Sequence, residues 1–110
     1  MSPGDIVWVE FPAGEGRAQA GRRPAIVLQT AALNLPTTLL VPLSSQLSAL
    51  RFPGTVLIEP DATNGLRLPS VALIFQLRAV DRRFVGSNLG RLSAEKLAEI
   101  LAALDELTNR

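Results

Sequence analysis

The sequence predicts a mainly β domain with one C-terminal α-helix, folded as a small and highly curved barrel. Between residues 6 and 85 the chain carries short apolar or alternating runs separated by Gly, Pro and Asn, a pattern typical of strands and turns. From residue 93 the apolar residues recur at spacings of three and four, which is typical of an amphipathic helix. A length of 110 residues, of which 47% are hydrophobic, predicts one domain over residues 1–110 with a substantial core.

Five strands are expected, followed by a short sixth. In chain order they are Ile6–Phe11, Pro24–Gln29, Thr37–Leu43, Thr55–Glu59, Val71–Val80 and Arg82–Val85. The first and the fifth alternate in residue type, whereas the second is a continuous apolar run, as expected of a buried strand. Pro12–Gly21 is rich in Gly and Ala and predicts a loop long enough to have a function. Pro60–Gly65 carries turn residues, and its Asn-Gly pair can take positive φ.

The last segment is expected to form a helix that begins after Ser93. Ser93 is a suitable N-cap, and Glu95 in the first turn suits the helix dipole. The apolar face is expected to consist of Leu97, Ile100, Leu101, Leu104 and Leu107. A small barrel has little interior volume, and the mean hydropathy is +0.25, so apolar surface is expected to remain. A homodimer would cover it.

The composition excludes several classes of site. Cysteine and histidine are both absent, so there can be no disulfide, no thiolate metal site and no imidazole base. The carboxylates are scattered along the chain, so neither a metal nor another cofactor is expected. No apolar run approaches the roughly 20 residues of a membrane span, and the N-terminus lacks the pattern of a signal peptide. A cytoplasmic protein without a membrane partner is expected.

The charge is unevenly distributed although its net value is only +1. The span from Pro12 to Leu92 carries +5, and the segment from Ser93 onward carries −2. Ten of the eleven cationic side chains are arginine. This preference suits phosphate recognition, because the guanidinium fork matches phosphate oxygens. Codon bias in a GC-rich genome accounts for it equally well.

The segment Gly21–Leu28 is the most informative motif. It brings two adjacent arginines, Arg22 and Arg23, to the start of an apolar strand, and Pro24 restricts the backbone of Arg23 to extended geometry. A guanidinium held at a strand entrance is a natural phosphate receptor. The structural alternative is a surface arginine that merely flanks a strand.

Together with four further segments, this motif resembles the MazF/PemK family of toxins, the ribosome-independent mRNA interferases of bacterial type II toxin–antitoxin modules. The similar blocks are Gly4–Phe11, Gln19–Leu28, Pro42–Gln46, Ser70–Arg78 and Gly90–Ser93. Their order along nearly the whole chain makes the resemblance specific. It implies an SH3-like barrel of the CcdB/PemK type, a homodimer, and sequence-specific cleavage of single-stranded RNA without a metal. It also implies a MazE-like antitoxin that occupies the groove of the dimer.

By the same resemblance, the catalytic pair of the family carries over to Arg23 and Ser44. The 2′-hydroxyl of the RNA would be the nucleophile, leaving a 2′,3′-cyclic phosphate and a 5′-hydroxyl. Arg23 is permanently charged, so it suits stabilisation of transition-state charge, with proton donation to the leaving oxygen as a secondary role. Ser44 would donate a hydrogen bond to the phosphate, and Ser45 beside it could take that role instead. Alternatively, both serines satisfy backbone groups in a turn.

The remaining RNA-binding candidates are polar or cationic. They are Arg17, Gln19, Arg22, Ser45, Gln46, Arg51, Gln76 and Arg78. Gln can read base edges, and Arg can hold phosphates or stack on bases. Each also has a plain structural interpretation: a loop arginine is usually just solvated, and Gln76 could serve the core or the dimer seam. Trp8 is expected in the core or an interface and not as a platform for stacking bases.

The chain departs from the family pattern at positions that concern RNA preference. Gly16-Arg17-Ala18-Gln19 stands where members often have Gly-Ser-Glu-Gln, so an acidic residue is missing, and the Asp before Ser-Val is Pro69. One alternative function is that of a CcdB-like, non-enzymatic toxin that binds DNA gyrase. The chain lacks the C-terminal tryptophan of that family. A third alternative is a barrel that only binds RNA or a partner chain.

Overall fold

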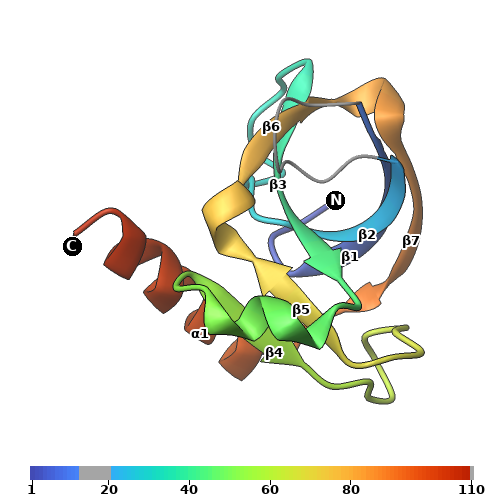
Figure 1. The fold of residues 1–110 in the computed structure, drawn as a ribbon. Coiled ribbons are helices and arrows are strands. Elements are labelled where there is room, and N and C mark those ends of the chain that lie inside the picture. Colours follow the sequence, from blue (N-terminus) through green and yellow to red (C-terminus); the bar gives the residue numbers. More distant parts are fainter. Residues whose placement is uncertain (13–20, 110) are drawn as a thin grey trace.

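The strands form one antiparallel sheet that curves strongly on itself, with the single helix packed beside it (Figure 1). The computed structural model describes residues 1–12 and 21–109. The strands are β1 Asp5–Phe11, β2 Gly21–Val27, β3 Thr37–Ser44, β4 Thr55–Ile58, β5 Ser70–Leu73, β6 Arg78–Asp81 and β7 Val85–Arg91. Three short 3-10 helices, η1 Leu47–Arg51, η2 Ile74–Gln76 and η3 Arg82–Phe84, precede the helix α1 Ala94–Leu107. The predicted class, mainly β with a C-terminal helix, is confirmed.

The sheet is an open form of the predicted barrel. Its strand order is β4-β5-β3-β2-β1-β7, with β6 also paired to β3, so β4 and β7 lie at opposite ends of this order. In Figure 1, β1, β2, β3, β6 and β7 surround the upper part of the molecule, and β4, β5 and α1 lie below it. Within the described part of the chain, no helix is long and apolar enough to cross a membrane.

Strand β2 begins earlier than predicted and includes both arginines of the motif. Arg22 lies opposite Glu10 and Arg23 opposite Val9, while Pro24 lies opposite Trp8. The strand continues upstream of Pro24 because β1 supplies a pairing partner as far as Phe11. Arg23 is therefore part of the sheet and not of a loop in front of it.

The single long strand predicted over 71–80 is wrong, because η2 divides it into β5 and β6. The first half of β3 pairs with β6, from Thr37 opposite Asp81 to Leu40 opposite Arg78. The last two residues of β3 pair with β5, Leu43 opposite Ala72. The segment from β5 to β6 therefore pairs with two separate parts of β3. The residues that connect the two pairings form η2. Alternation of residue type continues through such a break and cannot reveal it.

The region after residue 81 also differs from the prediction. Residues 82–84 form η3, capped by the Asp81 carboxylate, which accepts a hydrogen bond from the Arg83 N–H at 3.0 Å. Strand β7 follows and was not predicted, because its sequence GSN with a later glycine has low β propensity. It pairs along β1, and this pairing imposes the strand.

Helix α1 begins as predicted, since the Ser93 hydroxyl accepts a hydrogen bond from the Lys96 N–H at 3.1 Å. Ile100 is fully buried, but Leu101 and Leu107 are 45% and 42% exposed. The predicted apolar face is therefore only partly used inside this chain. Part of it remains available for contacts with another molecule.

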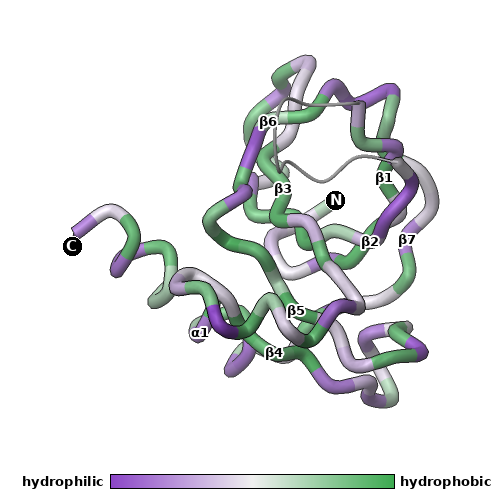
Figure 2. The backbone as a smooth tube through the Cα atoms, in the orientation of Figure 1, coloured by the Kyte–Doolittle hydropathy of each residue, from purple (hydrophilic) through white to green (hydrophobic). Residues whose placement is uncertain are grey.

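Two core clusters occupy the two faces of the sheet. The first lies between the strands and α1 and includes Ile6, Ile26, Leu43, Ile58 and Ile100. The second lies inside the curve of the sheet and includes Val7, Val9, Phe11, Val27 and Leu40. Alternate residues of β1 therefore enter different clusters. Figure 2 shows that β3, β4 and β5, which contribute residues to the first cluster, are largely hydrophobic.

Candidate nucleic-acid interface and active site

The predicted catalytic pair comes from neighbouring strands. Ala25 of β2 lies opposite Pro42 of β3. Arg23 precedes Ala25 by two residues and Ser44 follows Pro42 by two, so both lie just beyond the last paired residues of β2 and β3. Both residues line the same cleft, so their side chains can approach one bound phosphate.

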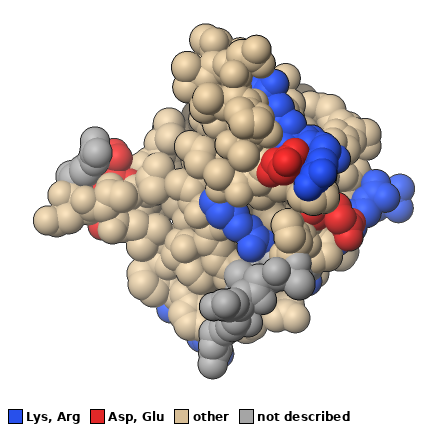
Figure 3. All heavy atoms as spheres, turned by 90° about the horizontal axis from the view of Figure 1, so that it is seen from above, with Lys and Arg blue, Asp and Glu red and all other residues tan. Residues whose placement is uncertain are grey.

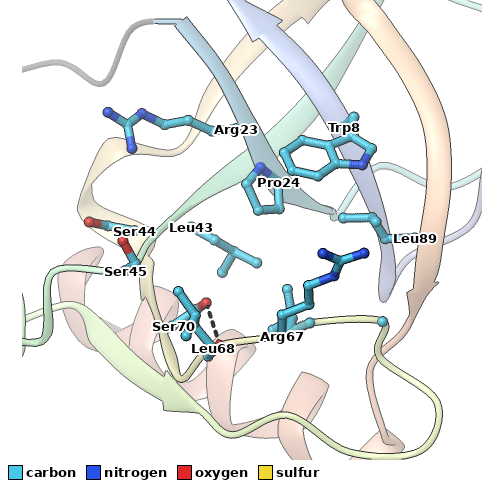
Figure 4. A pocket seen from close by; sticks show the side chains of 12 residues that line it. Trp8, Arg23, Pro24, Leu43, Ser44, Ser45, Arg67, Leu68, Ser70 and Leu89 are labelled. Atoms are coloured by element: carbon cyan, nitrogen blue, oxygen red, sulfur yellow. Dashed lines mark hydrogen bonds between the residues drawn. The ribbon is translucent and has the colours of Figure 1, made fainter.

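Arg23, Ser44 and Ser45 line one open cleft of about 560 Å³. We call it the first cleft. In Figure 4, Arg23 and the two serines lie at the same edge of this space, with the serines below Arg23. The rest of the lining is mostly apolar and includes Trp8, Pro24, Leu43, Leu68 and Leu89. The cleft therefore joins a polar end to an apolar interior.

Ser44 is 5% exposed, and its Oγ accepts a hydrogen bond from the Gln46 N–H at 3.1 Å. Ser44 therefore satisfies a backbone group in a turn, which is the structural alternative considered from the sequence. This bond uses only an acceptor position of the hydroxyl, because a serine has one O–H donor besides its acceptor positions. The O–H of Ser44 can still be donated to a ligand. Ser45 is exposed and lines the same cleft.

Ser44 also lines a second cleft, of about 580 Å³. This second cleft gathers three of the predicted RNA-binding residues, Gln46, Arg51 and Gln76. Two aromatic rings lie with them: Phe52 and Phe75 have ring centroids 5.8 Å apart, and the Arg51 guanidinium lies 4.8 Å from the Phe52 centroid. Ser44 is therefore shared by two adjoining clefts.

Other predicted residues lie elsewhere or are not described. Arg22 packs over the Trp8 ring at 4.9 Å and Arg78 over the Phe11 ring at 4.3 Å, and neither lines the two clefts. Burial lowers the pKa of the Arg78 guanidinium from its usual value. Arg17 and Gln19 belong to residues 13–20, outside the described residues. The binding roles of these four residues stay predictions.

Sequence reasoning missed Arg67 and the exposed part of Trp8. Arg67 lies in the segment between the 60–65 turn and β5 and lines the first cleft across from Arg23 (Figure 4). Trp8 was expected in the core or an interface, but it is only partly buried and also lines the first cleft. Only the position of Arg67 two residues after a turn glycine could have drawn attention to it.

The charged side chains that line the two clefts are all arginines. In the view of Figure 3, basic side chains occur in several separate groups, and acidic side chains lie beside some of these groups but not beside the central one. Neither cleft has an Asp or Glu in its lining. Among the residues with described positions, no group of three or more acidic side chains is arranged to hold a metal ion.

Comparison with known proteins identifies the family. A sequence profile described as PemK-like, MazF-like toxin of type II toxin–antitoxin system matches residues 2–108. The chain is 33% identical to the endoribonuclease toxin MazF of Escherichia coli K12 over 107 residues, which cover 94% of this chain and 90% of that protein. It is 28% identical to the endoribonuclease MazF of Staphylococcus saprophyticus, covering 96% of this chain and 88% of that protein.

Solved structures agree with the sequence relatives. The crystal structure of MazF from Deinococcus radiodurans is 30% identical and has a TM-score of 0.84, over 100% of this chain and 97% of that one. A MazE-MazF structure from the same organism matches at 30% identity and a TM-score of 0.77, over 99% and 96% of the chains. These matches favour the RNA-cleaving toxins over the CcdB-like alternative. The chain belongs to the PemK-like, MazF-like toxin family of type II toxin–antitoxin systems.

Proposed function

We propose that this toxin is a sequence-specific endoribonuclease that cuts single-stranded RNA without a metal ion. The observation that carries the proposal is that Arg23 and Ser44 line the polar end of one open cleft. Relatives that match nearly the whole chain are named endoribonuclease MazF. Because such RNA is found in the cytoplasm, we place the protein there.

The reaction uses the nucleophile that RNA itself provides. The 2′-oxygen attacks the adjacent phosphorus as its proton passes to a water molecule. The bond from phosphorus to the 5′-oxygen of the next nucleotide breaks, and that oxygen takes up a proton from water. The products are a 2′,3′-cyclic phosphate and a 5′-hydroxyl. Negative charge increases on the phosphate oxygens during this step, and Arg23 stabilises it with donors that stay charged at neutral pH. Arg23 can also donate a proton to the leaving 5′-oxygen as a secondary role.

Ser44, at the end of β3, positions the phosphate. Its Oγ is held by the Gln46 N–H, so the hydroxyl has a defined position before RNA binds. Donation of its O–H to a phosphate oxygen orients the phosphorus toward the 2′-hydroxyl. Such positioning lowers the barrier because the entropy of alignment is lost on binding and not in the transition state.

The decisive test is Arg23→Ala beside Arg82→Ala. Removal of one transition-state donor typically costs about 10²- to 10³-fold in rate, so we expect Arg23→Ala to lose cleavage at least to that extent. Arg82 lies on η3, outside both clefts, and its replacement is expected to leave the rate unchanged. Circular dichroism checks that both variants fold. Full activity of Arg23→Ala would refute the assignment.

Further variants separate the two serines. Ser44→Ala is expected to slow cleavage strongly, Ser44→Thr to retain it, and Ser45→Ala to have a small effect. The reverse order would make Ser45 the working hydroxyl. Cleavage should survive EDTA, and a 2′-deoxy nucleotide at the scissile position should block it. Inhibition by EDTA that Mg²⁺ reverses would contradict the metal-free reaction.

The second cleft is proposed to hold RNA on the other side of the cut. Arg51 supplies a charge there, and Gln46 and Gln76 offer amide groups that can hydrogen-bond to base edges. Replacing Arg51 by Ala is expected to weaken binding to all sequences alike. The slope of log Kd against log salt should fall by about 0.7 for the loss of one phosphate contact.

We further propose a homodimer through an apolar face made of Leu47, Leu50, Phe52, Phe75 and Leu107. Each of these side chains is 40% to 47% exposed. The face is connected around Gly54: its carbonyl accepts a hydrogen bond from the Phe75 N–H at 3.3 Å, and a Cβ added to Gly54 would be 2.7 Å from the Leu107 side chain. Leu50→Glu should shift sedimentation toward a monomer, whereas Leu33→Glu, an exposed leucine in the 28–36 loop, should not. Equal sedimentation of the two variants would mean that the dimer interface lies on another face.

The partner is proposed to be a MazE-like antitoxin that covers the clefts. The Deinococcus radiodurans relative has been solved as MazE-MazF. An acidic peptide would neutralise Arg23 and Arg51 and thereby compete with RNA for the same charges. The cognate antitoxin should inhibit cleavage in proportion to RNA it displaces in a fluorescence competition assay. Binding of the antitoxin without displacement of RNA would contradict this surface.

A further inference from the structure

We propose that the first cleft is the binding site for one nucleobase next to the cleaved bond, and that Arg67 reads the edge of that base. The inference rests on the proposed ribonuclease function and adds a specificity-determining residue to it. It uses the part of the cleft beyond Arg23 and Ser44, which the cleavage step leaves unassigned.

Arg67 faces the cleft from the wall opposite Arg23. It follows the 60–65 turn, and Figure 4 shows its guanidinium directed into the same space as Trp8 and Leu89. The residue is exposed, and its side chain has no hydrogen-bond or ion-pair partner among the residues that the structure describes. Its donors are therefore available to a ligand.

The space between the two arginines suits a planar apolar ring. Trp8, Leu68 and Leu89 line it, and Trp8 is only partly buried. Aromatic and aliphatic faces of this kind bind bases by stacking, which contributes equally for any base. Discrimination must then come from a polar group at the base edge, and Arg67 is the cation at that end of the cleft.

The segment that carries Arg67 is fixed at both ends. On one side, the buried Asn64 side chain accepts a hydrogen bond from the Leu66 N–H at 3.0 Å. On the other, the Ser70 hydroxyl donates to the Leu68 carbonyl at 3.1 Å (Figure 4). Gly65 lies so close to β7 that an added Cβ would be 2.1 Å from the Leu89 carbonyl oxygen. Because its backbone is fixed, Arg67 can donate hydrogen bonds in a defined direction and so prefer bases whose acceptors lie there.

The positions of the phosphate-binding residues and of Arg67 define which part of the RNA each would contact. A phosphate at Arg23 and Ser44 places the attached nucleoside in the apolar space, and Arg67 then meets hydrogen-bond acceptors on the base. Two adjacent acceptors, as in guanine O6 and N7, match the guanidinium fork best. A contact to a neighbouring phosphate would give affinity without sequence preference, and the test separates these two cases.

The test compares Arg67→Ala with Arg82→Ala, two losses of one exposed arginine. Cut sites are mapped by primer extension on one long RNA. Binding is measured by fluorescence anisotropy with oligonucleotides that carry a 2′-deoxy nucleotide at the scissile position, so that they are not cleaved. In a second series, one base at a time is removed from the oligonucleotide.

We expect Arg67→Ala to relax preference at a single position beside the cut and to weaken binding about five- to tenfold. An abasic nucleotide at that position should weaken wild-type binding more than Arg67→Ala does, because it removes stacking as well as the edge contact, and it should weaken binding by Arg67→Ala less than it weakens wild-type binding. Equal weakening for all sequences would overturn base reading, and so would behaviour identical to that of Arg82→Ala. Absence of cleavage by the wild type would refute the proposed function instead, since the binding series needs no cleavage.

Discussion

Replacing Asn64 by Ala is expected to destabilise the fold by about 2–4 kcal/mol. Asn64 is 1% exposed, and its side chain makes three hydrogen bonds. Its Oδ1 accepts from the Asp61 N–H at 3.2 Å and the Leu66 N–H at 3.0 Å, and its Nδ2 donates to the Glu59 carbonyl at 2.8 Å. Each hydrogen bond contributes about 0.5–1.5 kcal/mol net to stability. Asn64→Ala would also leave the backbone partners of these bonds without a partner in a buried turn, which adds to the destabilisation.

Thermal and urea unfolding measure this effect. For a domain of this size each kcal/mol lowers Tm by about 4 °C, so a fall of about 8–16 °C is expected. Asn88→Ala is the matched control, because Asn88 is exposed on β7. A loss below about 0.5 kcal/mol for Asn64→Ala, or equal losses for both variants, would refute the reasoning. Because the same turn holds the segment with Arg67, the variant should also lose the Arg67-dependent part of RNA binding.

Three further predictions concern the same turn and the helix. Gly90→Ala should cost about 1–3 kcal/mol in urea unfolding, because its Cβ would be 2.3 Å from the Thr63 carbonyl oxygen, whereas Gly86→Ala has a nearest contact of 3.4 Å and should be tolerated. Ser93→Ala should lower stability by about 1 kcal/mol through loss of the N-cap, measured by the same unfolding curves. The N–H groups of Thr63 and then Asn64 lower the pKa of Asp61, so the native state holds its proton less tightly than the unfolded state. The stabilisation is therefore present at neutral pH and lost as pH falls below about 4; the Tm difference between wild type and Asp61→Asn should shrink between pH 6 and pH 3, and a constant difference would contradict it.

The sequence predicted elements whose pattern is local. The period of three to four identifies α1, and the Ser93 cap marks its start. β1 and β3 are found within a residue or so of their predicted ends. The failures lie where a distant partner decides the structure. β7 is a strand because β1 pairs with it, and η2 breaks the predicted 71–80 strand because β3 takes two partners.

The same division applies to the site. Arg23 and Ser44 were identified from motifs and a family resemblance, but only the structure shows that they line the same cleft. Arg67 carries no motif. It enters the cleft because Asn64 and Gly65 fit the turn closely against β7, and this packing depends on residues far away in the sequence. Side chains delivered by a packed turn are the ones that residue patterns cannot locate.

The break at η2 also explains how one hydroxyl can serve two binding regions. Where β3 passes from β6 to β5, its end at Ser44 lies between the first cleft and the second. Under the proposed function, only the phosphate at Ser44 can have its neighbours in both clefts at once. The cut position would then be set by the geometry of the sheet, whereas the preferred bases would be set separately on each side. Changes at Arg67 and at Gln46 or Gln76 should therefore alter preferences on opposite sides of the same cut without moving it.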